Sequence, residues 1–524
     1  MHRGGGRTRR TGGLSIGMVV LVTGLLLGCG SDDHRGGSRD GIVSGAREAA
    51  GGGTAMGSAA PGRGTNNGQS ARVIHAFLNN ILQDWEGQGV FAQRFEELTG
   101  VELTITQPPH QSYSERVFLQ LASENVPDVI EILPEHLPRL LGSGLIIPLN
   151  DLQAGGRYSG SIEERFLESV RHPSGALYGI PSRNGGGCVT YIRRDWLDNL
   201  GLPVPRTWDE LQEVLLAFTF GDPNGSGRDD TYGYTDVAAG SADWYNRLIM
   251  GAGRIEIYYD YQRQEWVDGF TSPETREALI RYKALYDLGV IDPGVPTNTT
   301  YTARTKFING QVGMFTYWAN HWARNLQDRT RAASSPQAQI APMPALEDGR
   351  YIIRIAPLLV ITTEAEDSRW VYDTFIDSQF DKGPMQELFT YGVEGYHWQM
   401  NDQDELVFLE NPQDPYGARF TKSYVPPSGV INGWQLPAPL DPLVAEAGRV
   451  LEENPYYERQ KWGGEYYSQY FVEIEQHLKA ELLTAYLTGS LSLEQTMEQY
   501  RRQSRAYYID RILAELNGPG LDRN

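Results

Sequence analysis

Apolar and polar residues alternate in a β-α-β order near the start of the folded part of the chain. Val101–Thr106 alternates apolar and polar positions as a half-buried strand does, and Val126–Leu133 is a second candidate strand. Between them, Ser112–Ser123 places its apolar residues at helical intervals. This order predicts a mixed α/β domain with a largely parallel sheet.

A second unit of the same kind follows. Val189–Arg193 is a candidate strand, and Thr207 with Glu210 forms a capping box that starts a helix. The helix carries one apolar stripe, made of Trp208, Leu211, Val214, Leu215 and Phe218. The pattern predicts a second α/β lobe.

A further helix is predicted in the middle of the chain, and the last third is predicted to be helical. Ser272-Pro273 starts a helix that Gly289 ends, since Pro suits a first helical turn and Gly a C-terminal cap. Further on, apolar residues recur every four positions and Gly489 ends the run, which contains Ile474, Leu478, Leu482 and Tyr486. Ser492 and Gln495 cap the next helix. The pattern therefore indicates at least two α/β lobes and a helical C-terminus.

The N-terminal residues are typical of an export signal. Four arginines precede the apolar stretch Leu14–Leu27, which is shorter than the roughly 20 residues of a membrane-spanning helix. Gly28 then precedes Cys29, as in lipoprotein signals, so residues 1–28 are predicted to be a lipoprotein signal peptide and Cys29 the lipidated residue. A plain signal peptide or a short core helix is the alternative. Residues 29–70 are glycine-rich and are predicted to form a flexible tether.

Composition excludes several classes of protein. The 524 residues include 66 acidic and 46 basic ones, a formal charge of −20, which argues against nucleic acid as a partner. Two cysteines exclude a disulfide-rich scaffold. Tyrosine pairs such as Tyr456-Tyr457 and Tyr466-Tyr467 resemble stacking surfaces for single strands, but the negative charge argues against that use.

Four segments together resemble family 1 extracellular solute-binding proteins, the ligand receptors of ABC importers, and in particular the alginate-binding ones. They are Leu121–Ile130; Tyr178–Pro181, followed by Tyr191–Trp196, Leu200–Pro203 and Pro205–Leu211; Gly310–Met314, leading into Tyr317-Trp318; and Tyr391–Gly395. The resemblance implies a two-lobed periplasmic-binding-protein-like fold of type II, with mixed sheets flanked by helices. Residues 71–185 and 355–430 would form the first lobe, and 186–354 and 431–524 the second. Chain crossings would lie near Ser182–Cys188, Gly349–Ile355 and Pro426–Asn432.

Oxygen-bearing residues in one loop are spaced as in an EF-hand calcium loop. Positions 1, 3, 5, 7 and 9 are Asp222, Asn224, Ser226, Arg228 (through its carbonyl) and Asp230, and Gly227 stands at position 6. Ser226 replaces the usual Asp or Asn, and position 12 is Gly233 rather than Glu. The alginate-binding relatives carry a similar loop here, which favours structural Ca²⁺; a turn without metal is the alternative.

Aromatic residues are the candidate ligand platforms, because sugar C–H faces pack on aromatic rings. With the resemblance in place, the predicted binding residues are Trp244, Tyr245, Trp318, Trp398, Glu131, Arg183, Asn184 and Glu394. Each aromatic residue taken alone is more often part of a core, and the polar ones can belong to a solvated loop.

The predicted function is that of a tethered receptor, which captures an oligosaccharide between its lobes and delivers it to an ABC permease. Such a receptor is expected to be a monomer held at the membrane through Cys29, and not an enzyme. Two alternatives stay open. A secreted glycosidase needs a pair of carboxylates flanking the scissile bond, which no motif singles out. A binding module for a peptide or polyanion is the other.

Overall fold

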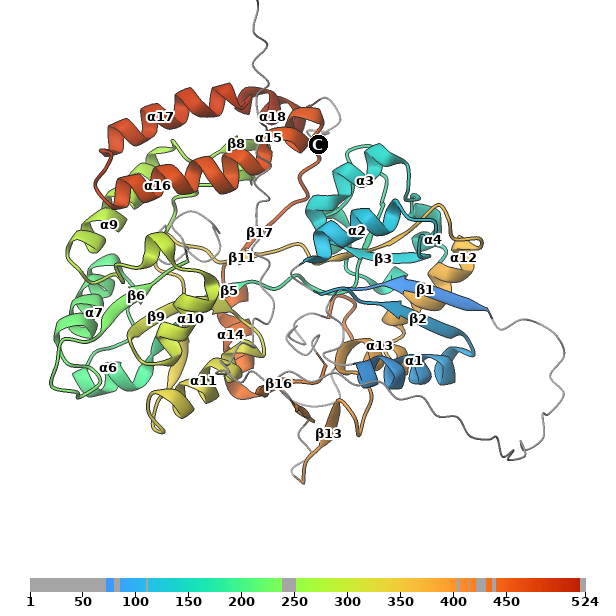
Figure 1. The fold of residues 1–524 in the computed structure, drawn as a ribbon, viewed down its shortest axis with the longest axis horizontal. Helices are drawn as coiled ribbons and strands as arrows, with labels where there is room; N and C mark the ends of the chain where they lie inside the picture. Colours follow the sequence, from blue (N-terminus) through green and yellow to red (C-terminus); the bar gives the residue numbers. More distant parts are fainter. Residues whose placement is uncertain are drawn as a thin grey trace, which may run out of the picture.

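The structure is a computed structural model that describes residues 72–79, 85–109, 112–237, 251–402, 406–412, 414–420, 430–435 and 440–518. The chain folds into two lobes that lie side by side (Figure 1). No helix among these residues is long and apolar enough to cross a membrane.

The first lobe is built on a five-stranded sheet. Its strand order is β2 (Glu102–Thr106), β1 (Val73–Phe77), β3 (Val129–Ile132), β12 (Leu358–Ile361) and β4 (Ile180–Pro181). β1 pairs in parallel with β2 and β3, whereas β12 is antiparallel to both of its neighbours. The main helices around it are α1 (Trp85–Thr99), α2 (Tyr113–Leu121), α3 (Leu137–Ser143) and α13 (Pro384–Tyr391). The predicted β-α-β order in this lobe is confirmed.

Shorter elements complete the first lobe. They are η2 (Pro134–His136), α4 (Asn150–Ala154), η3 (Ser159–Ser161), α5 (Glu164–Glu168), α12 (Ser368–Val371), η5 (Tyr372–Ile376), η6 (Asp377–Phe380), β13 (Trp398–Met400), β14 (Leu406–Phe408), β15 (Glu410–Asn411) and β16 (Asp414–Ala418). One apolar core runs through the lobe and includes residues as far apart in sequence as Ile74 and Ile431.

The second lobe holds a four-stranded sheet in the order β10 (Ile340–Met343), β5 (Cys188–Arg193), β9 (Val312–Trp318) and β6 (Tyr232–Thr235). The helices packed with it are α6 (Arg194–Leu200), α7 (Trp208–Phe220), α9 (Pro273–Asp287), η4 (Val295–Thr297), α10 (Thr300–Ile308), α11 (Trp322–Ala333) and α14 (Pro442–Glu452). A separate hairpin joins β7 (Ile257–Asp260) to β8 (Glu265–Asp268). The Thr207–Glu210 capping box is present at the start of α7, as predicted.

The C-terminal helices belong to the second lobe. α15 (Glu465–Val472), the π-helical turn η9 (Glu473–Leu478) and α16 (Lys479–Leu487) follow one another, and α17 (Leu493–Ala506) and α18 (Ile509–Leu516) complete the group (Figure 1). Their apolar side chains share one core with α7 and α9. Gly489 has φ +81, and Ser492 with Gln495 forms the predicted capping box.

The chain crosses between the lobes in segments that pack against one another. Gly186 O accepts a hydrogen bond from Arg354 N at 2.8 Å, so the first two crossings lie side by side. A Cβ atom on Gly185 would stand 1.9 Å from the Arg354 carbonyl oxygen, which explains why glycine is needed there. Directly before Arg354, β11 (Ile352–Ile353) pairs in parallel with β17 (Tyr456–Tyr457).

The later crossings follow the last chain segment of the first lobe. Ile431 belongs to the first core and Val444 to the second lobe, so this crossing lies between them. The chain touches the first lobe once more at Gln460, whose backbone N donates to Ser169 O at 3.0 Å, before α15 begins. The crossings thus form a connected layer between the two lobes.

Candidate functional site

A cavity of about 450 Å³ lies between the lobes. The first lobe contributes α2 and η2, the second lobe β7 and α15, and the crossings β11 and β17 close it between them. The residues that matter most for its chemistry are Phe118, His136, Arg139, Arg254, Tyr258, Trp266, Arg354, Tyr456, Arg459, Gln460, Lys461, Tyr467, Phe471 and Lys479. The cavity is therefore lined by aromatic rings and polar groups from both lobes.

Cations and aromatic rings are paired along the cavity wall. The Arg254 Cζ atom lies 3.7 Å from the ring centroid of Tyr456 and 4.3 Å from that of Tyr258. On the opposite lobe, the Arg139 Cζ atom lies 3.9 Å from the Phe118 centroid. Such contacts fix the guanidinium planes, and Arg254 is also ion-paired with Glu256.

A buried ion-pair cluster forms the base of one wall. Lys479 is 1% exposed, and its Nζ atom lies 3.2 Å from Asp268 Oδ1 and also contacts Glu475. Burial opposes the charge on Lys479, but the two carboxylates outweigh it and raise the pKa of this lysine. Tyr500 donates to Asp268 Oδ2 at 2.8 Å. The cluster holds α16 against the β7–β8 hairpin and keeps the wall rigid.

Buried polar atoms without a hydrogen-bond partner among the described residues occur on the cavity wall. Among them are Nδ1 of His136 and Oε1 of Gln460, in residues that are 6% and 5% exposed. Burial, and secondarily the nearby Arg139, lowers the pKa of His136 against the opposing effect of Glu135. The imidazole is therefore neutral at pH 7 and, like the Gln460 amide oxygen, is able to bond a ligand hydroxyl.

Four of the predicted binding residues meet at the crossings. Glu131, at the end of β3, is 1% exposed; its Oε1 lies 3.3 Å from Arg183 Nη1, and its Oε2 accepts from Asn79 N at 3.1 Å. Asn184 is buried, and its side-chain oxygen accepts from Gly186 N at 3.2 Å. The Trp318 ring, at the end of β9, lies under Arg354, whose Cζ atom is 5.4 Å from the ring centroid.

The other predicted binding residues lie elsewhere. Trp398 is 4% exposed in the first lobe, and its Nε1 donates to Gly392 O at 3.2 Å. Glu394 is exposed next to it. Neither residue lines the cavity, and none of the four residues at the crossings does so. Trp244 and Tyr245 lie outside the described residues.

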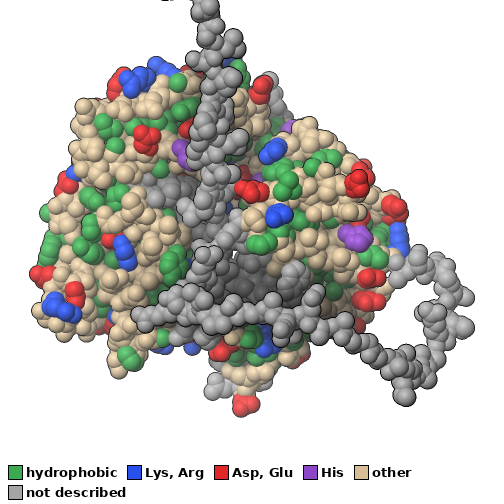
Figure 2. All heavy atoms as spheres, in the orientation of Figure 1, with side chains coloured by type: hydrophobic (Ala, Val, Ile, Leu, Met, Phe, Trp, Pro, Cys, Tyr) green, Lys and Arg blue, Asp and Glu red, His purple; other side chains and the backbone are tan. Residues whose placement is uncertain are grey.

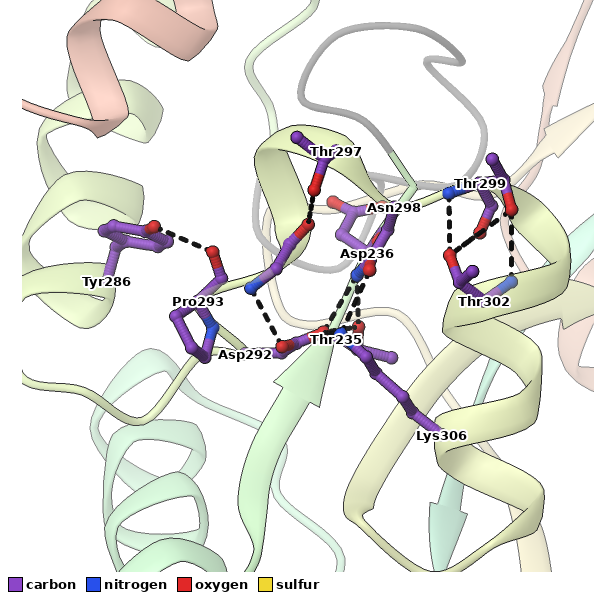
Figure 3. A network of polar contacts seen from close by, with 11 residues as sticks. Thr235, Asp236, Tyr286, Asp292, Pro293, Thr297, Asn298, Thr299, Thr302 and Lys306 are labelled. Atoms are coloured by element: carbon purple, nitrogen blue, oxygen red, sulfur yellow. Dashed lines mark hydrogen bonds and ion pairs between the residues drawn. The ribbon is translucent and has the colours of Figure 1, made fainter.

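A polar network fixes the end of β6, where the chain leaves the sheet toward residues 238–250 (Figure 3). Asp292 Oδ2 accepts from Thr235 Oγ1 at 2.7 Å and from Asn298 Nδ2 at 2.8 Å, and it lies 2.6 Å from Lys306 Nζ. The next residue, Asp236, is buried, and this burial raises the pKa of its carboxyl to about 7. The network gives the edge of the second sheet a fixed shape.

The loop with EF-hand spacing is closed by hydrogen bonds among its own residues, and the Asn224 side-chain oxygen accepts from Ser226 N at 3.1 Å. Asp222 Oδ2 accepts from Gly227 N at 3.0 Å, while Asp222 Oδ1 is buried and has no hydrogen-bond partner among the described residues. Asn224 Nδ2 and Ser226 Oγ lie 3.0 and 3.1 Å from Asp230 Oδ1. The unpartnered carboxylate oxygen of Asp222 suits a hard cation, although only two of the candidate ligands are carboxylates.

The sequence interpretation missed most of the cavity wall. Tyr456 and Tyr467 stand in the tyrosine pairs that were considered only as nucleic-acid platforms. His136 and Gln460 lie in no motif. A signal existed in the tyrosine pairs, but nothing in the sequence shows that β17 and α15 meet α2 across the gap between lobes.

The fold is that of a two-lobed protein with a cavity between its lobes. The model of the bacterial extracellular solute-binding protein family matches residues 86–375, more than half of the chain. The protein belongs to this family, which is one of binding proteins rather than enzymes.

Several characterised proteins are similar to the chain. A polygalacturonan/rhamnogalacturonan-binding protein of Bacillus subtilis is 28% identical over 344 residues, which are 61% of this chain and 65% of the relative. Lipoprotein LipO of the same organism is 26% identical over 59% and 63% of the two chains. The chain thus aligns with slightly less than two thirds of these two relatives. A fructooligosaccharide ABC transporter substrate-binding protein of Streptococcus pneumoniae, FusA, is 29% identical over 80% of both chains.

Solved structures confirm the predicted fold. FusA of S. pneumoniae in complex with kestose superposes with a TM-score of 0.62 at 16% identity, covering 85% of this chain and 98% of that one. The alginate-binding protein AlgQ2 gives a TM-score of 0.61 at 19% identity, covering 86% and 98%. The two-lobed periplasmic-binding-protein fold predicted from the sequence is therefore correct, and the family resemblance is confirmed.

Proposed function

We propose that this protein captures an oligosaccharide in the interlobe cavity and delivers it to an ABC permease. The observation that carries the proposal is the pairing of aromatic walls with the two unpartnered buried polar atoms of His136 and Gln460. Aromatic rings suit sugar C–H faces, and a buried polar atom without a partner is satisfied when a ligand hydroxyl enters. Relatives named for fructooligosaccharide and polygalacturonan binding support a carbohydrate ligand.

The lobes supply the mechanism of capture. A ligand that contacts α2 on one lobe and α15 on the other binds the closed arrangement better than an open one, and so shifts the population toward closure. No bond is made or broken in this process. The permease is proposed to recognise the closed form.

A thermal-shift screen with neutral and acidic oligosaccharides tests the proposal. A sugar at 100 times its Kd should stabilise the protein by about 2.7 kcal/mol. Tyr467→Ala should lose that shift, whereas Tyr301→Ala, an exposed tyrosine of α10 outside the cavity, should keep it. Failure of every sugar to raise the melting temperature would contradict a carbohydrate ligand, and cleavage of a sugar during incubation would favour the glycosidase alternative.

The protein is further proposed to be exported and held at the membrane through a lipid on Cys29, and to act as a monomer. The extracellular family and a lipoprotein relative support export. Mass spectrometry of the N-terminal peptide should find acyl groups on Cys29, and Cys29→Ser should release the protein from membranes. Unmodified Cys29 in membrane-bound protein would contradict the anchor.

The loop from Asp222 to Asp230 is proposed to bind a structural calcium ion through Asp222, Asn224, Ser226, the Arg228 carbonyl and Asp230. The buried, unpartnered Asp222 Oδ1 atom and the spacing support this proposal. Solved structures of the same fold include an EF-hand mutant of FusA and AlgQ2 without calcium ion. A chelator should lower the melting temperature of the wild type and leave Asp222→Asn unchanged; an equal melting temperature with and without chelator would overturn the proposal.

A further inference from the structure

The cavity between the lobes has a charge pattern that bears on the class of sugar. Three of its carboxylates are ion-paired with cations in or beside the same cavity: Glu256 with Arg254, Glu458 with Lys461, and Glu475 with Lys479. The first two pairs are neutral, and Lys479 also lies 3.2 Å from Asp268 Oδ1, so these groups leave no unpaired cation for a ligand.

Two other arginines of the cavity have no carboxylate partner among the described residues. Arg139 stands on the first lobe and has the Phe118 ring 3.9 Å from its Cζ atom. Arg459 lies on the last crossing, and its Cζ atom is 4.4 Å from the ring centroid of Tyr259 in the second lobe. Each guanidinium is therefore held in place by an aromatic face and not by an anion.

A guanidinium stacked in this way keeps its planar fork of N–H donors available. That fork matches a carboxylate bidentately, whereas a hydroxyl uses only one donor. The same side of the cavity also carries Glu115 and Glu135, which are exposed as Arg139 is, so water screens all three charges; neither carboxylate is ion-paired with Arg139 among the described residues. The neutral His136 adds a hydrogen-bonding atom without adding charge.

We infer that the cavity binds an acidic oligosaccharide, with Arg139 on one lobe and Arg459 at the other side each able to take a carboxylate of a uronic acid unit. The inference rests on the proposed function, since it specifies the ligand of the same cavity. Because the two arginines reach the cavity from different sides, an anionic ligand also favours the closed arrangement of the lobes. Within a strongly negative chain, the cavity thereby carries two arginines that have no carboxylate partner among the described residues.

Calorimetric titration of the purified protein with matched ligands tests this inference. The probes are trigalacturonic acid and its fully methyl-esterified form, which differ only in the carboxylate charge, together with neutral galacto- and fructo-oligosaccharides. The acid should bind at least about tenfold more tightly than the ester. Arg139→Gln and Arg459→Gln should each remove most of that preference, while the control Arg157→Gln should retain it. Arg157 also stacks on an aromatic ring, 5.0 Å from the Tyr158 centroid, but lies outside the cavity.

The possible results separate the two proposals. Equal or tighter binding of the ester or of a neutral sugar would overturn the acidic preference and leave the oligosaccharide receptor intact. Loss of acid binding in Arg157→Gln to the same extent as in the two cavity variants would overturn the assignment to Arg139 and Arg459. Binding of none of the sugars would overturn both proposals. Circular dichroism of each variant shows whether it is folded.

Discussion

Arg183 Nη1 lies 3.3 Å from Glu131 Oε1, and this contact joins the end of β3 to the first crossing. Glu131 is 1% exposed and Arg183 is 19% exposed in their side chains. The sequence predicted each residue as a ligand contact, whereas the structure pairs them with each other. The ion pair therefore holds the first crossing against the first-lobe sheet.

Separating this pair should destabilise the first lobe. Arg183→Met leaves the buried Glu131 carboxylate without its cation, and we expect a double-mutant cycle with Glu131→Gln to give a coupling of about 0.5–3 kcal/mol. Urea unfolding of the four proteins measures it. A coupling near zero would mean that water already satisfies Glu131.

The packing of the first two crossings depends on a missing side chain at Gly185. In Gly185→Ala the new Cβ atom would stand 1.9 Å from Arg354 O, so the first two crossing segments must move apart. Gly186→Ala is the matched control, because Gly186 has φ +65 but open space around it, and should cost about 1–2 kcal/mol. We expect Gly185→Ala to be the more destabilising of the two by thermal denaturation, and the reverse order would contradict the close packing.

Replacement of His136 should raise the stability of the ligand-free protein and weaken sugar binding. His136→Leu replaces a buried atom without a partner by an apolar group of similar size, so the ligand-free protein should gain about 1 kcal/mol. Sugar binding should weaken about tenfold, because a ligand hydroxyl loses its partner. Thermal denaturation and calorimetry measure the two effects. A less stable variant that binds as tightly as the wild type would show that His136 serves the core alone.

Asp236 should make stability depend on pH. Burial raises the pKa of its carboxyl from 3.8 to about 7, so the folded protein keeps a proton that the unfolded chain has lost. The contribution of Asp236 is therefore complete below about pH 4 and is lost as the pH rises through 7. The difference in melting temperature between the wild type and Asp236→Asn should change steadily over this range, to the disadvantage of the wild type at high pH. A difference independent of pH would contradict the raised pKa.

Local elements were predictable because their signals lie within a few neighbouring residues. The Thr207–Glu210 and Ser492–Gln495 capping boxes and the strand ending at Thr106 all appear where the pattern placed them. The family segments then fixed the two-lobed fold. The calcium loop remains a prediction.

The binding surface was less predictable, since a tryptophan in the sequence carries no sign of which side it faces. Trp398 resembled a ligand platform in sequence, yet the first lobe buries it. Tyr467 stands in a tyrosine pair that was not predicted to bind sugar, yet it lies on the cavity wall.

By itself, the sequence determined the elements, the two-lobed class and the acidic, aromatic composition, because hydrophobic spacing and capping act over short stretches of chain. Only the tertiary structure decided that Glu131 pairs with Arg183 and that α2 and α15 share one cavity. It also decided that Arg139 and Arg459 line that cavity without carboxylate partners in the part of the chain that the structure describes. These contacts join residues from 52 to more than 300 positions apart, and it is the packing of the crossings that sets their distances.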